Sequence, residues 1–302
     1  MSACYDCPRK CGVLRPATVD GAGTFGVCAM PTEPVVARAA LHFGEEPCIS
    51  GEKGSGTVFF SGCSLKCVFC QNYEISAKNF GQQITTERLR SIYFELMEQG
   101  AHNINLVNPT HFVRAIAESL REPIPVPVVY NCGGYESVSS LKKLEGKVQI
   151  YLPDLKYSDD SLALRYSSAP DYFETAKAAI LEMVRQTGPY QTDGDGMLQK
   201  GVLIRHLILP GHTENSKKII DWVADTFPKG TVLFSLMSQY VPCGKAAGYP
   251  PLDRPLTQEE YDEVEEHLFA RGIEAGFLQE LDSADTAYIP AFDLTGVNER
   301  KG

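Results

Sequence analysis

The stretch "TVFFSGCSLKCVFCQN", residues 57–72, joins a short apolar run to a loop that holds three cysteines. Residues 57–60 are β-branched or aromatic, which predicts a buried strand. Cys63, Cys67 and Cys70 then follow within eight positions. Thiols this close together in a loop indicate a metal site. The arrangement raises the question of why there are three, since a thiolate-bound zinc usually takes four ligands.

Five further apolar runs follow along the chain, and helix-like segments separate them. The six predicted strands are residues 57–60, 103–107, 126–130, 148–152, 201–209 and 231–237. Strands and helices in alternation require a parallel sheet, because parallel neighbours need long crossover connections. Either a doubly wound sheet or a complete or partial barrel would satisfy this α/β pattern.

Helices are predicted between these strands. Residues 85–100 begin with Thr85 as the N-cap, carry Glu87 in the first turn and stop at Gly100. Residues 256–272 have Thr257 as the cap and Glu260 three positions later, which is the pattern of a capping box. The other predicted helices are residues 109–121, 137–145, 171–187 and 214–227.

Polar segments follow all six predicted strands. They are the cysteine loop, "NPTH" (108–111), "NCGGYE" (131–136), "PDLKYSD" (153–159), "PGHTENS" (210–216) and "SQYVPCG" (238–244). The carboxyl ends of parallel strands share one rim, where barrel and open-sheet α/β enzymes build their sites. We therefore expect the functional site at this rim.

Three cysteines suit a cubane 4Fe–4S cluster, because such a cluster has four irons to ligate. Three thiolates leave one iron for a ligand that the protein does not supply. The spacing of three residues and then two suits a compact loop around a cluster. The alternatives are a zinc site completed by a distant residue such as Cys48, and three incidental thiols.

The C-x3-C-x2-C loop after the first strand of a βα-repeat chain resembles the signature of the radical S-adenosylmethionine (SAM) superfamily. The resemblance implies a partial (β/α)6 TIM-like barrel, with a small cysteine-rich N-terminal metal-binding region and a C-terminal helical extension. It implies that the free iron binds SAM and that one electron from the reduced cluster splits SAM into methionine and a 5′-deoxyadenosyl radical. That radical abstracts hydrogen from a substrate, so the chain is expected to be an oxidoreductase. Its electron donor would be a protein such as flavodoxin or ferredoxin.

Four longer segments resemble the subgroup similar to pyruvate formate-lyase activating enzyme, called the PflX-like group. They are "GSGTVFFSGCSLKCVFCQNYEIS", "GAHNINLVNPTHF", "IYLPDLKY" and "LILPGHTENS". The resemblance implies that Phe69 lies near the adenine of SAM. Asp154 and Lys156 match an Asp-x-Lys motif that acts near the methionyl moiety, and residues two apart on a strand also share one face. An ordinary ion pair at a strand end is the alternative for these two residues.

Three functions are compatible with this resemblance. The first is an activase that takes a hydrogen atom from a glycine of a glycyl-radical enzyme. The second is the radical modification of a small molecule or a peptide, because a shared barrel does not determine the substrate. The third is a non-enzymatic iron–sulfur scaffold or electron carrier.

The chain departs from the superfamily after the second strand. Many members carry Gly-Gly-Glu there, whereas this chain has "NPTH". Asn108 and Thr110 are expected to supply hydrogen-bonding groups to SAM instead. His111 is a candidate catalytic residue, together with Asp154 and Lys156, although lone histidines are often packed in the core.

Three further residues are candidates for binding SAM. Asn131 and Gly133 lie in the loop after the third strand, where Gly133 would allow close approach of the backbone; a simple tight turn is the alternative. Arg205, in the fifth run, is expected to pair with a carboxylate of SAM or of the substrate. The neighbouring His206 is equally compatible with a structural role.

Four cysteines near the N-terminus have the spacing C-x2-C-x3-C-x16-C. They are Cys4, Cys7, Cys11 and Cys28. Four soft ligands in a segment with few core residues suit a metal site that helps the segment to fold. Zinc is favoured, an auxiliary iron–sulfur cluster is the alternative, and the absence of any metal is the third possibility. The remaining cysteines, interpreted as buried or incidental, are Cys48, Cys132 and Cys243.

Composition limits the class of protein. A chain of 302 residues with 43% hydrophobic and 22% charged residues can form one large α/β domain with an appendage. We predict an N-terminal region at 1–50, a barrel at 51–245 and an extension at 246–302. The net charge of −10 argues against nucleic acid as a partner. Because the chain has no signal-like opening and no stretch of about 18 apolar residues, a cytoplasmic protein without a membrane partner is expected.

Overall fold

The computed structural model describes residues 3–279 and 290–299 of the chain. Its centre is a sheet with the strand order β10-β9-β8-β6-β5-β4-β2-β1-β3. All strands from β2 to β10 along this path run parallel. These parallel strands are β2 (Ser55–Phe60), β4 (Ile104–Val107), β5 (Val128–Cys132), β6 (Ile150–Pro153), β8 (Leu198–Leu207), β9 (Leu233–Met237) and β10 (Gly276–Leu278).

Antiparallel strands extend this parallel sheet. β1 (Val35–His42) pairs with β2, and β3 (Gln82–Gln83) pairs with β1. β7 (Gln191–Thr192) pairs with the start of β8. Among the described strands no pairing joins β3 to β10. The sheet is therefore open, and the prediction of a partial barrel is confirmed.

Each of the six predicted runs overlaps one parallel strand, so the prediction of a parallel α/β sheet is confirmed. β1, β3, β7 and β10 were not predicted. β3 and β7 have two residues each and β10 has three, so they are too short to show a period-two pattern.

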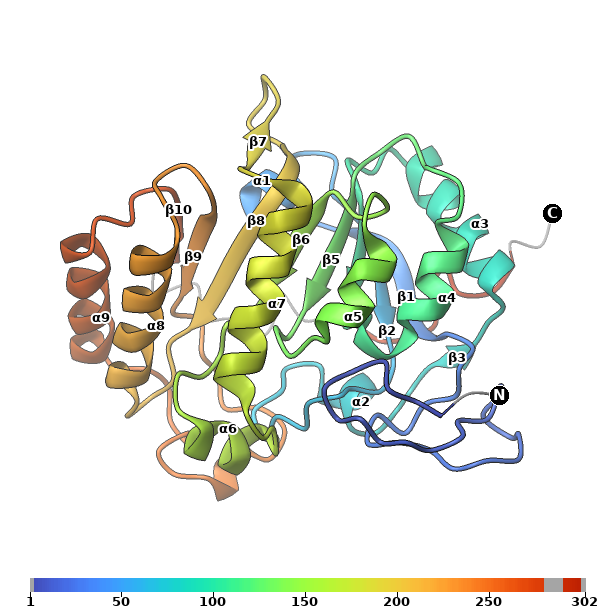
Figure 1. Ribbon diagram of the computed structural model, residues 1–302, viewed down its shortest axis with the longest axis horizontal. Helices are drawn as coiled ribbons and strands as arrows, with labels where there is room; N and C mark the ends of the chain where they lie inside the picture. Colours follow the sequence, from blue (N-terminus) through green and yellow to red (C-terminus); the bar gives the residue numbers. More distant parts are fainter. Residues whose placement is uncertain (1–2, 280–289, 300–302) are drawn as a thin grey trace.

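Helices cover one face of the sheet, as Figure 1 shows for α3, α4, α5, α7, α8 and α9 in front of the strands. Their bounds are α3 (Thr86–Glu98), α4 (Val113–Ser119), α5 (Val138–Leu141), α7 (Tyr172–Thr187), α8 (Thr213–Thr226) and α9 (Gln258–Ala270). Two short helices, α2 (Tyr73–Ser76) and α6 (Asp160–Ser167), lie beyond the carboxyl ends of the strands. The 3-10 turns are η1 (Thr110–Phe112), η2 (Lys142–Leu144) and η3 (Ala246–Gly248).

The predicted helix caps are present. The Thr85 side chain accepts a hydrogen bond from the Arg88 backbone N–H at 3.1 Å and starts α3. Thr257 and Glu260 form the predicted capping box of α9. Each cap satisfies backbone donors that have no partner inside the helix, so both helices begin where the sequence indicates.

Alternate residues of the strands divide the core in two. Val58 and Phe60 of β2 belong to the large apolar cluster beneath the helices. Phe59 belongs to a separate cluster with Val107 of β4. One set of alternating side chains therefore faces the helices. The side chains between them build the other, concave face of the sheet.

The short helix α1 (Pro47–Ser50) closes part of this concave face. Its Cys48 and Ile49 pack with Val129 of β5 and with Ile150 and Leu152 of β6. In Figure 1, α1 lies at the amino end of the strands, opposite α2 and α6. Cys48 is thus a buried core residue far from the cysteine loop, and the structure gives no support to a zinc site that it would complete.

The sheet crosses both predicted domain boundaries. β1 and α1 come from residues 1–50, and α9 and β10 come from residues 246–302. The division of the chain at 50 and 245 stays a prediction, and residues 280–289 and 300–302 of the extension lie outside the described residues. In the part of the chain that the structure describes, no helix has the length and apolar character needed to span a membrane.

Candidate active site

A cavity of about 250 Å³ lies at the carboxyl ends of the parallel strands. Its lining includes Cys63, Phe69, Asn108, Asn131, Asp154 and Arg205. Cys67, Cys70, Gly133 and Lys156 also line it. The cavity therefore lies at the rim that the strand order predicted, and most of the candidate site residues meet there.

The cysteine loop is held at this rim by backbone hydrogen bonds to α6. Lys66 N donates to Ser167 O at 3.2 Å, and Val68 N donates to Tyr166 O at 2.8 Å. Gly62, at the start of the loop, has a φ of +76°, and a Cβ there would lie 2.6 Å from Cys28 O. The loop is thus packed between α6 and the N-terminal segment, and only glycine fits where it meets that segment.

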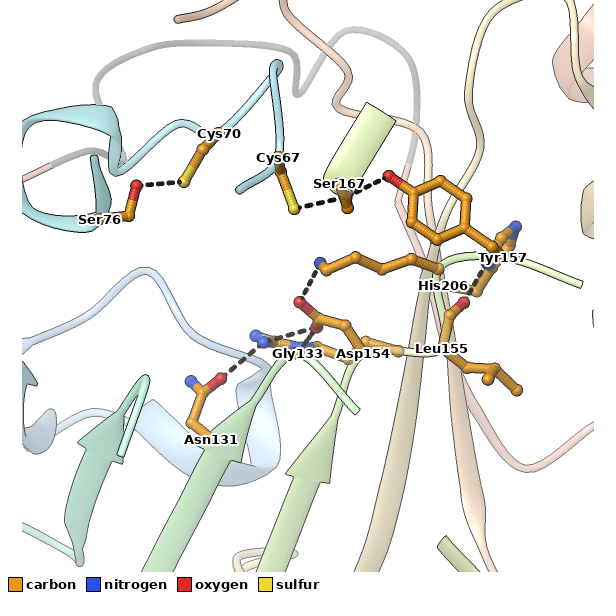
Figure 2. A network of polar contacts seen from close by, with 12 residues as sticks. Cys67, Cys70, Ser76, Asn131, Gly133, Asp154, Leu155, Tyr157, Ser167 and His206 are labelled. Carbon is orange, nitrogen blue, oxygen red and sulfur yellow. Dashed lines mark hydrogen bonds and ion pairs between the residues drawn. The ribbon is translucent and has the colours of Figure 1, made fainter. Parts of the chain in front are cut away.

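Two serines donate hydrogen bonds to the loop thiols (Figure 2). Ser167 Oγ donates to Cys67 Sγ at 2.9 Å, and Ser76 Oγ donates to Cys70 Sγ at 3.2 Å. Burial raises the pKa of Cys67, although the Lys156 ammonium and the Ser167 hydroxyl oppose this effect. Burial raises the pKa of Cys70 to about 11, and the neighbouring Cys67 adds to this shift.

Burial also raises the pKa of Cys63, with charge on Cys67 and Cys70 acting in the same direction. Three thiols with raised pKa values become thiolates when cationic metal compensates their charge, so the donor set fits an iron–sulfur cluster. Within residues 3–279 and 290–299, no group of three or more His, Cys, Asp or Glu side chains has the arrangement that holds a single metal ion. A 4Fe–4S cluster is a different case, because each iron takes its own thiolate.

Asp154 lies opposite the thiols of Cys67 and Cys70 in Figure 2, and it joins Lys156 in a buried charged network. Lys156 Nζ lies 2.6 Å from Asp154 Oδ2, and Arg205 Nε donates to Asp154 Oδ1 at 2.9 Å. Arg205 also donates to Asn131 Oδ1 at 2.7 Å and to Glu45 Oε2 at 2.9 Å. Asn131 Nδ2 donates to Glu45 Oε1 at 2.9 Å, which closes the network.

The charges in this network are fixed by one another. Burial by itself would raise the pKa of Asp154, but Arg205 and Lys156 outweigh it and hold the pKa below the usual value. Burial by itself would lower the pKa of Lys156, but Asp154 and Cys67 outweigh it and raise the pKa. Asp154, Lys156 and Arg205 therefore face the same cavity in ionised form, with the Glu45 carboxyl group beside Arg205.

Asn108 shapes the rim beside the loop. It has a positive φ of 59°, and its backbone N–H donates to Asn131 O at 2.8 Å. Its side-chain amide donates to Gly62 O, so part of its hydrogen-bonding capacity holds the cysteine loop in place.

The structure does not bring Thr110 and His111 to the cavity. Both are 2% exposed and lie in η1, beneath the cysteine loop. Thr110 Oγ1 donates to Glu136 Oε1 at 2.5 Å, and His111 Nε2 lies 2.7 Å from Ser61 O. Burial lowers the pKa of His111 to about 3, so its imidazole is neutral. These contacts suit a structural role for both residues.

The two glycines of "NCGGYE" serve different purposes. Gly134 has a φ of +75°, and a Cβ there would lie 2.3 Å from Asp154 O, so the turn requires glycine. A Cβ on Gly133 would lie 2.6 Å from Leu65 Cδ1 in the cysteine loop. Gly133 thus permits close approach of that loop to the rim.

Phe69 lines the cavity, whereas His206 does not. The ring centroid of Phe69 lies 6.0 Å from that of Tyr240. His206 is fully buried, with Nδ1 2.6 Å from Leu155 O and Nε2 2.8 Å from Ser216 Oγ. His206 therefore ties β8 to β6 and α8, which is the structural role that the sequence allowed.

Sequence reasoning missed four residues at or near the site. They are Glu45, Ser76, Ser167 and Glu136. Glu45 precedes α1 and reaches Arg205 across 160 positions of sequence, so no local pattern points to it. Glu136 is buried beneath the rim, and burial raises its pKa to about 7. Among these four residues, only Glu136 had a signal in the sequence, because it lies in the polar segment "NCGGYE" after the third predicted strand.

Residues 49–136 match the protein family described as a 4Fe-4S single cluster domain, and this region includes the cysteine loop. The uncharacterized protein MJ0674 of Methanocaldococcus jannaschii is 30% identical over 271 residues, which cover 86% of this chain and 72% of that protein.

Three solved structures resemble this chain at low identity. SuiB of Streptococcus suis, bound to the precursor peptide SuiA, is 13% identical with a TM-score of 0.46; the match covers 74% of this chain and 48% of that one. A domain of pyruvate-formate lyase-activating enzyme from Bacteroides vulgatus is 14% identical with a TM-score of 0.38 and coverages of 65% and 91%. The FeFe-hydrogenase maturase HydG of Carboxydothermus hydrogenoformans is 11% identical with a TM-score of 0.42 and coverages of 85% and 62%. The present chain thus spans about half the length of SuiB.

Proposed function

We propose that this chain, which belongs to the same protein family as the M. jannaschii relative, is a radical SAM enzyme. The observation that carries the proposal is a set of three thiols, all from one loop, that line a cavity opposite a buried network of fixed charges. Cys132 also contributes to the lining, but it belongs to the core beneath the helices, where its thiol meets Glu136. The loop therefore offers three ligands and leaves one cluster position open.

The residues that would hold the cofactors are defined by their chemistry. Cys63, Cys67 and Cys70 would bind three irons of a 4Fe–4S cluster. When bound, the cluster would supply one electron to SAM, whose cleavage yields methionine and a 5′-deoxyadenosyl radical that takes a hydrogen atom from the substrate. This radical chemistry belongs to the cofactors, and the chain supplies binding and orientation.

The charged network suits the methionyl end of SAM, which carries an ammonium and a carboxylate. Arg205 and Lys156 offer positive charge for a carboxylate, and Glu45 and Asp154 offer acceptors for an ammonium. These side chains already pair with one another, so little reorganisation is needed when the ligand arrives. On the loop, Phe69 offers an aromatic face to the adenine.

Cleavage of SAM by reconstituted protein tests the proposal. The native chain, loaded anaerobically with iron and sulfide and then reduced, should convert SAM to 5′-deoxyadenosine. Cys67→Ala should lose this product and the part of the iron and cluster absorbance that the cysteine loop holds. Cys243→Ser is the matched control, because Cys243 lies outside the cavity lining and should leave both unchanged.

Two outcomes would contradict the proposal. Unchanged product from Cys67→Ala would remove the loop as the cluster site. Loss of the cluster in Cys243→Ser would show a fourth thiol ligand, and the open iron position would disappear.

The finer hypothesis is that the radical takes hydrogen from a backbone glycine of a glycyl-radical enzyme. The match of Asp154 and Lys156 to the Asp-x-Lys motif of activating enzymes supports it. Mixing the reduced enzyme, SAM and a candidate glycyl-radical enzyme should then give a glycyl radical in the electron paramagnetic resonance (EPR) spectrum. SAM cleavage without such a signal would favour a small molecule or peptide as substrate, and a cluster without SAM cleavage would favour a scaffold or electron carrier. Flavodoxin and ferredoxin are the electron donors to compare.

A further inference from the structure

The N-terminal segment before β1 has little means of holding its own shape. Residues 3–34 contain no helix or strand. Met30 is buried, but five other large apolar side chains of the segment are between 39% and 58% exposed, namely Tyr5, Leu14, Val19, Phe25 and Val27. A segment that buries so little apolar surface needs another source of stability, such as a metal or a disulfide. Its cysteines are all free thiols in the structure.

Backbone contacts bring the first three cysteines together. Gly12 N donates to Cys4 O at 3.0 Å and Cys4 N donates to Val13 O at 2.9 Å, so Cys4 lies beside the backbone that follows Cys11. Lys10 N donates to Cys7 O at 3.0 Å, which forms a tight turn between Cys7 and Cys11. Lys10 adopts a positive φ of 44° in that turn.

The fourth cysteine joins this group from a second turn. Val27 N donates to Cys11 Sγ at 3.5 Å, which places the residue before Cys28 against the third cysteine. Ala29 N donates to Gly26 O at 2.9 Å, and Ala29 has a positive φ of 59°. An amide that donates to sulfur, with one turn after Cys7 and another around Cys28, suits thiolates that bind an iron–sulfur cluster.

Charge supports the same interpretation. Arg15 is 4% exposed, and its Nη1 lies 3.8 Å from Cys4 Sγ. A buried guanidinium next to Cys4 can balance part of the negative charge of thiolates that bind metal.

We infer that a second metal centre is bound by four thiolates, those of Cys4, Cys7, Cys11 and Cys28. This centre holds Arg9 and Arg15 against the catalytic loop, which is the cysteine loop that carries Cys63, Cys67 and Cys70. The ligand set suits an iron–sulfur cluster, because each iron of a cluster takes its own thiolate, whereas the described residues hold no group arranged for a single metal ion. The site is separate from the cavity, because none of the four cysteines lines it.

Arg9 connects this site to the catalytic loop. Its Nε donates to Ser64 O at 2.7 Å, next to Cys63, and its Nη2 donates to Ser167 O at 3.2 Å. Ser167 is the residue whose hydroxyl donates to Cys67 Sγ. The planar guanidinium therefore spans two elements that hold the three thiols, and Lys could not form the same pair of contacts.

Arg15 makes a second connection. Its Nη1 donates to His111 O at 2.7 Å and its Nε donates to Met30 O at 2.9 Å. His111 in turn contacts Ser61 O at the start of the catalytic loop. Disorder of the N-terminal segment would therefore remove supports from both sides of that loop.

Metal analysis of two variants tests the site itself. A variant with Cys63, Cys67 and Cys70 all changed to Ala should retain about four irons per chain and the visible absorbance of an iron–sulfur cluster. Combining it with Cys7→Ser and Cys11→Ser should remove that iron. The inference is overturned if the triple variant retains no iron, or if the added substitutions leave its iron content unchanged.

The connection to the catalytic loop needs a separate test, because it rests on the proposed function of Cys63, Cys67 and Cys70. Arg9→Ala should lose iron from the catalytic loop to a chelator about tenfold faster than the native chain, as expected when a group that supports a metal ligand is removed. Its reduced EPR spectrum should also change shape, and Arg9→Lys should not restore either property. Lys10→Gln, at the exposed neighbouring position, should behave as the native chain does.

Equal iron loss from Arg9→Ala and native protein would overturn the connection. If the proposed function is wrong and the second metal centre exists, the result is different. The variant without Cys63, Cys67 and Cys70 would keep its metal, but the native chain would not cleave SAM.

Discussion

Replacing Arg205 tests the buried network that faces the cavity. The side chain is 14% exposed and donates to Asp154, Glu45 and Asn131 at 2.9, 2.9 and 2.7 Å. Arg205→Gln would leave two buried carboxylates with one cation fewer. Removing one partner of a buried ion pair costs about 3–5 kcal/mol. Because Lys156 would still lie 2.6 Å from Asp154, we expect a loss near the lower end, about 3 kcal/mol of unfolding free energy at pH 7.

The loss should depend on pH in a defined direction. In the native chain the pKa of Asp154 is held below 3.8, which stabilises the fold above pH 3.8 and is lost as the pH falls through the folded-state pKa. Without Arg205, burial is less opposed and the pKa of Asp154 rises. The destabilisation should therefore be largest near pH 7 and should shrink as the pH falls toward about 4, where the carboxyl takes up a proton.

Urea unfolding of the metal-free, reduced chain at pH 7 and near pH 4.5 measures both effects. Arg121→Gln is the control, because Arg121 and Glu118 form an ion pair at 3.2 Å with side chains 66% and 60% exposed. That surface pair should contribute less than about 1 kcal/mol. A loss below about 1 kcal/mol for Arg205→Gln, or an equal loss at both pH values, would refute the assigned role of the network.

Three further substitutions have expected outcomes. Gly134→Ala should destabilise the chain by more than about 3 kcal/mol, because a clash with Asp154 O adds to left-handed backbone strain. Gly146→Ala should cost about 1 kcal/mol, because Gly146 has a φ of +77° but no atom within 4 Å of its Cβ position. Equal urea midpoints for the two variants would contradict this difference. Burial lowers the pKa of His111 to about 3, so as the pH falls from 6.5 to about 3 only the unfolded chain takes up the proton and the native chain loses stability. His111→Gln should lose less stability over this range. Parallel pH profiles of the urea midpoint for the native chain and the variant would contradict this expectation. Thr257→Ala should lower the free energy of unfolding by about 1 kcal/mol, because the capping box of α9 is lost. Thr257→Ser should keep most of that stability, and an equal loss in both variants would argue against capping.

The order of strands and helices could be predicted because its signals are local. Apolar runs such as 57–60 and 231–237, and caps such as Thr85 and Thr257, involve residues that are close in sequence. Parallel pairing then follows from the length of the connections. The antiparallel pairings of β1 with β2 and β3 could not be predicted, since they depend on segments that meet only in the folded chain.

The candidate site shows the same division. Cys63, Cys67 and Cys70 were identified from spacing alone, and their common cavity follows from one short loop. Thr110 and His111 lie in a segment of equally rich chemistry, but the loop above them covers their side chains. The direction of a side chain at a strand end depends on the path of the next few residues, and sequence spacing does not specify that path.

The sequence by itself determined a parallel α/β chain with a three-thiol loop after its first parallel strand, because periodicity and spacing are properties of neighbouring residues. Only the tertiary structure decided that Glu45 completes the charged network and that Ser167 and Arg9 support the thiols. Arg9 and Ser167 are 158 positions apart, and Glu45 and Arg205 are 160 apart. Contacts at such separations are set by how the elements pack against one another, and packing has no signature in any short stretch of sequence.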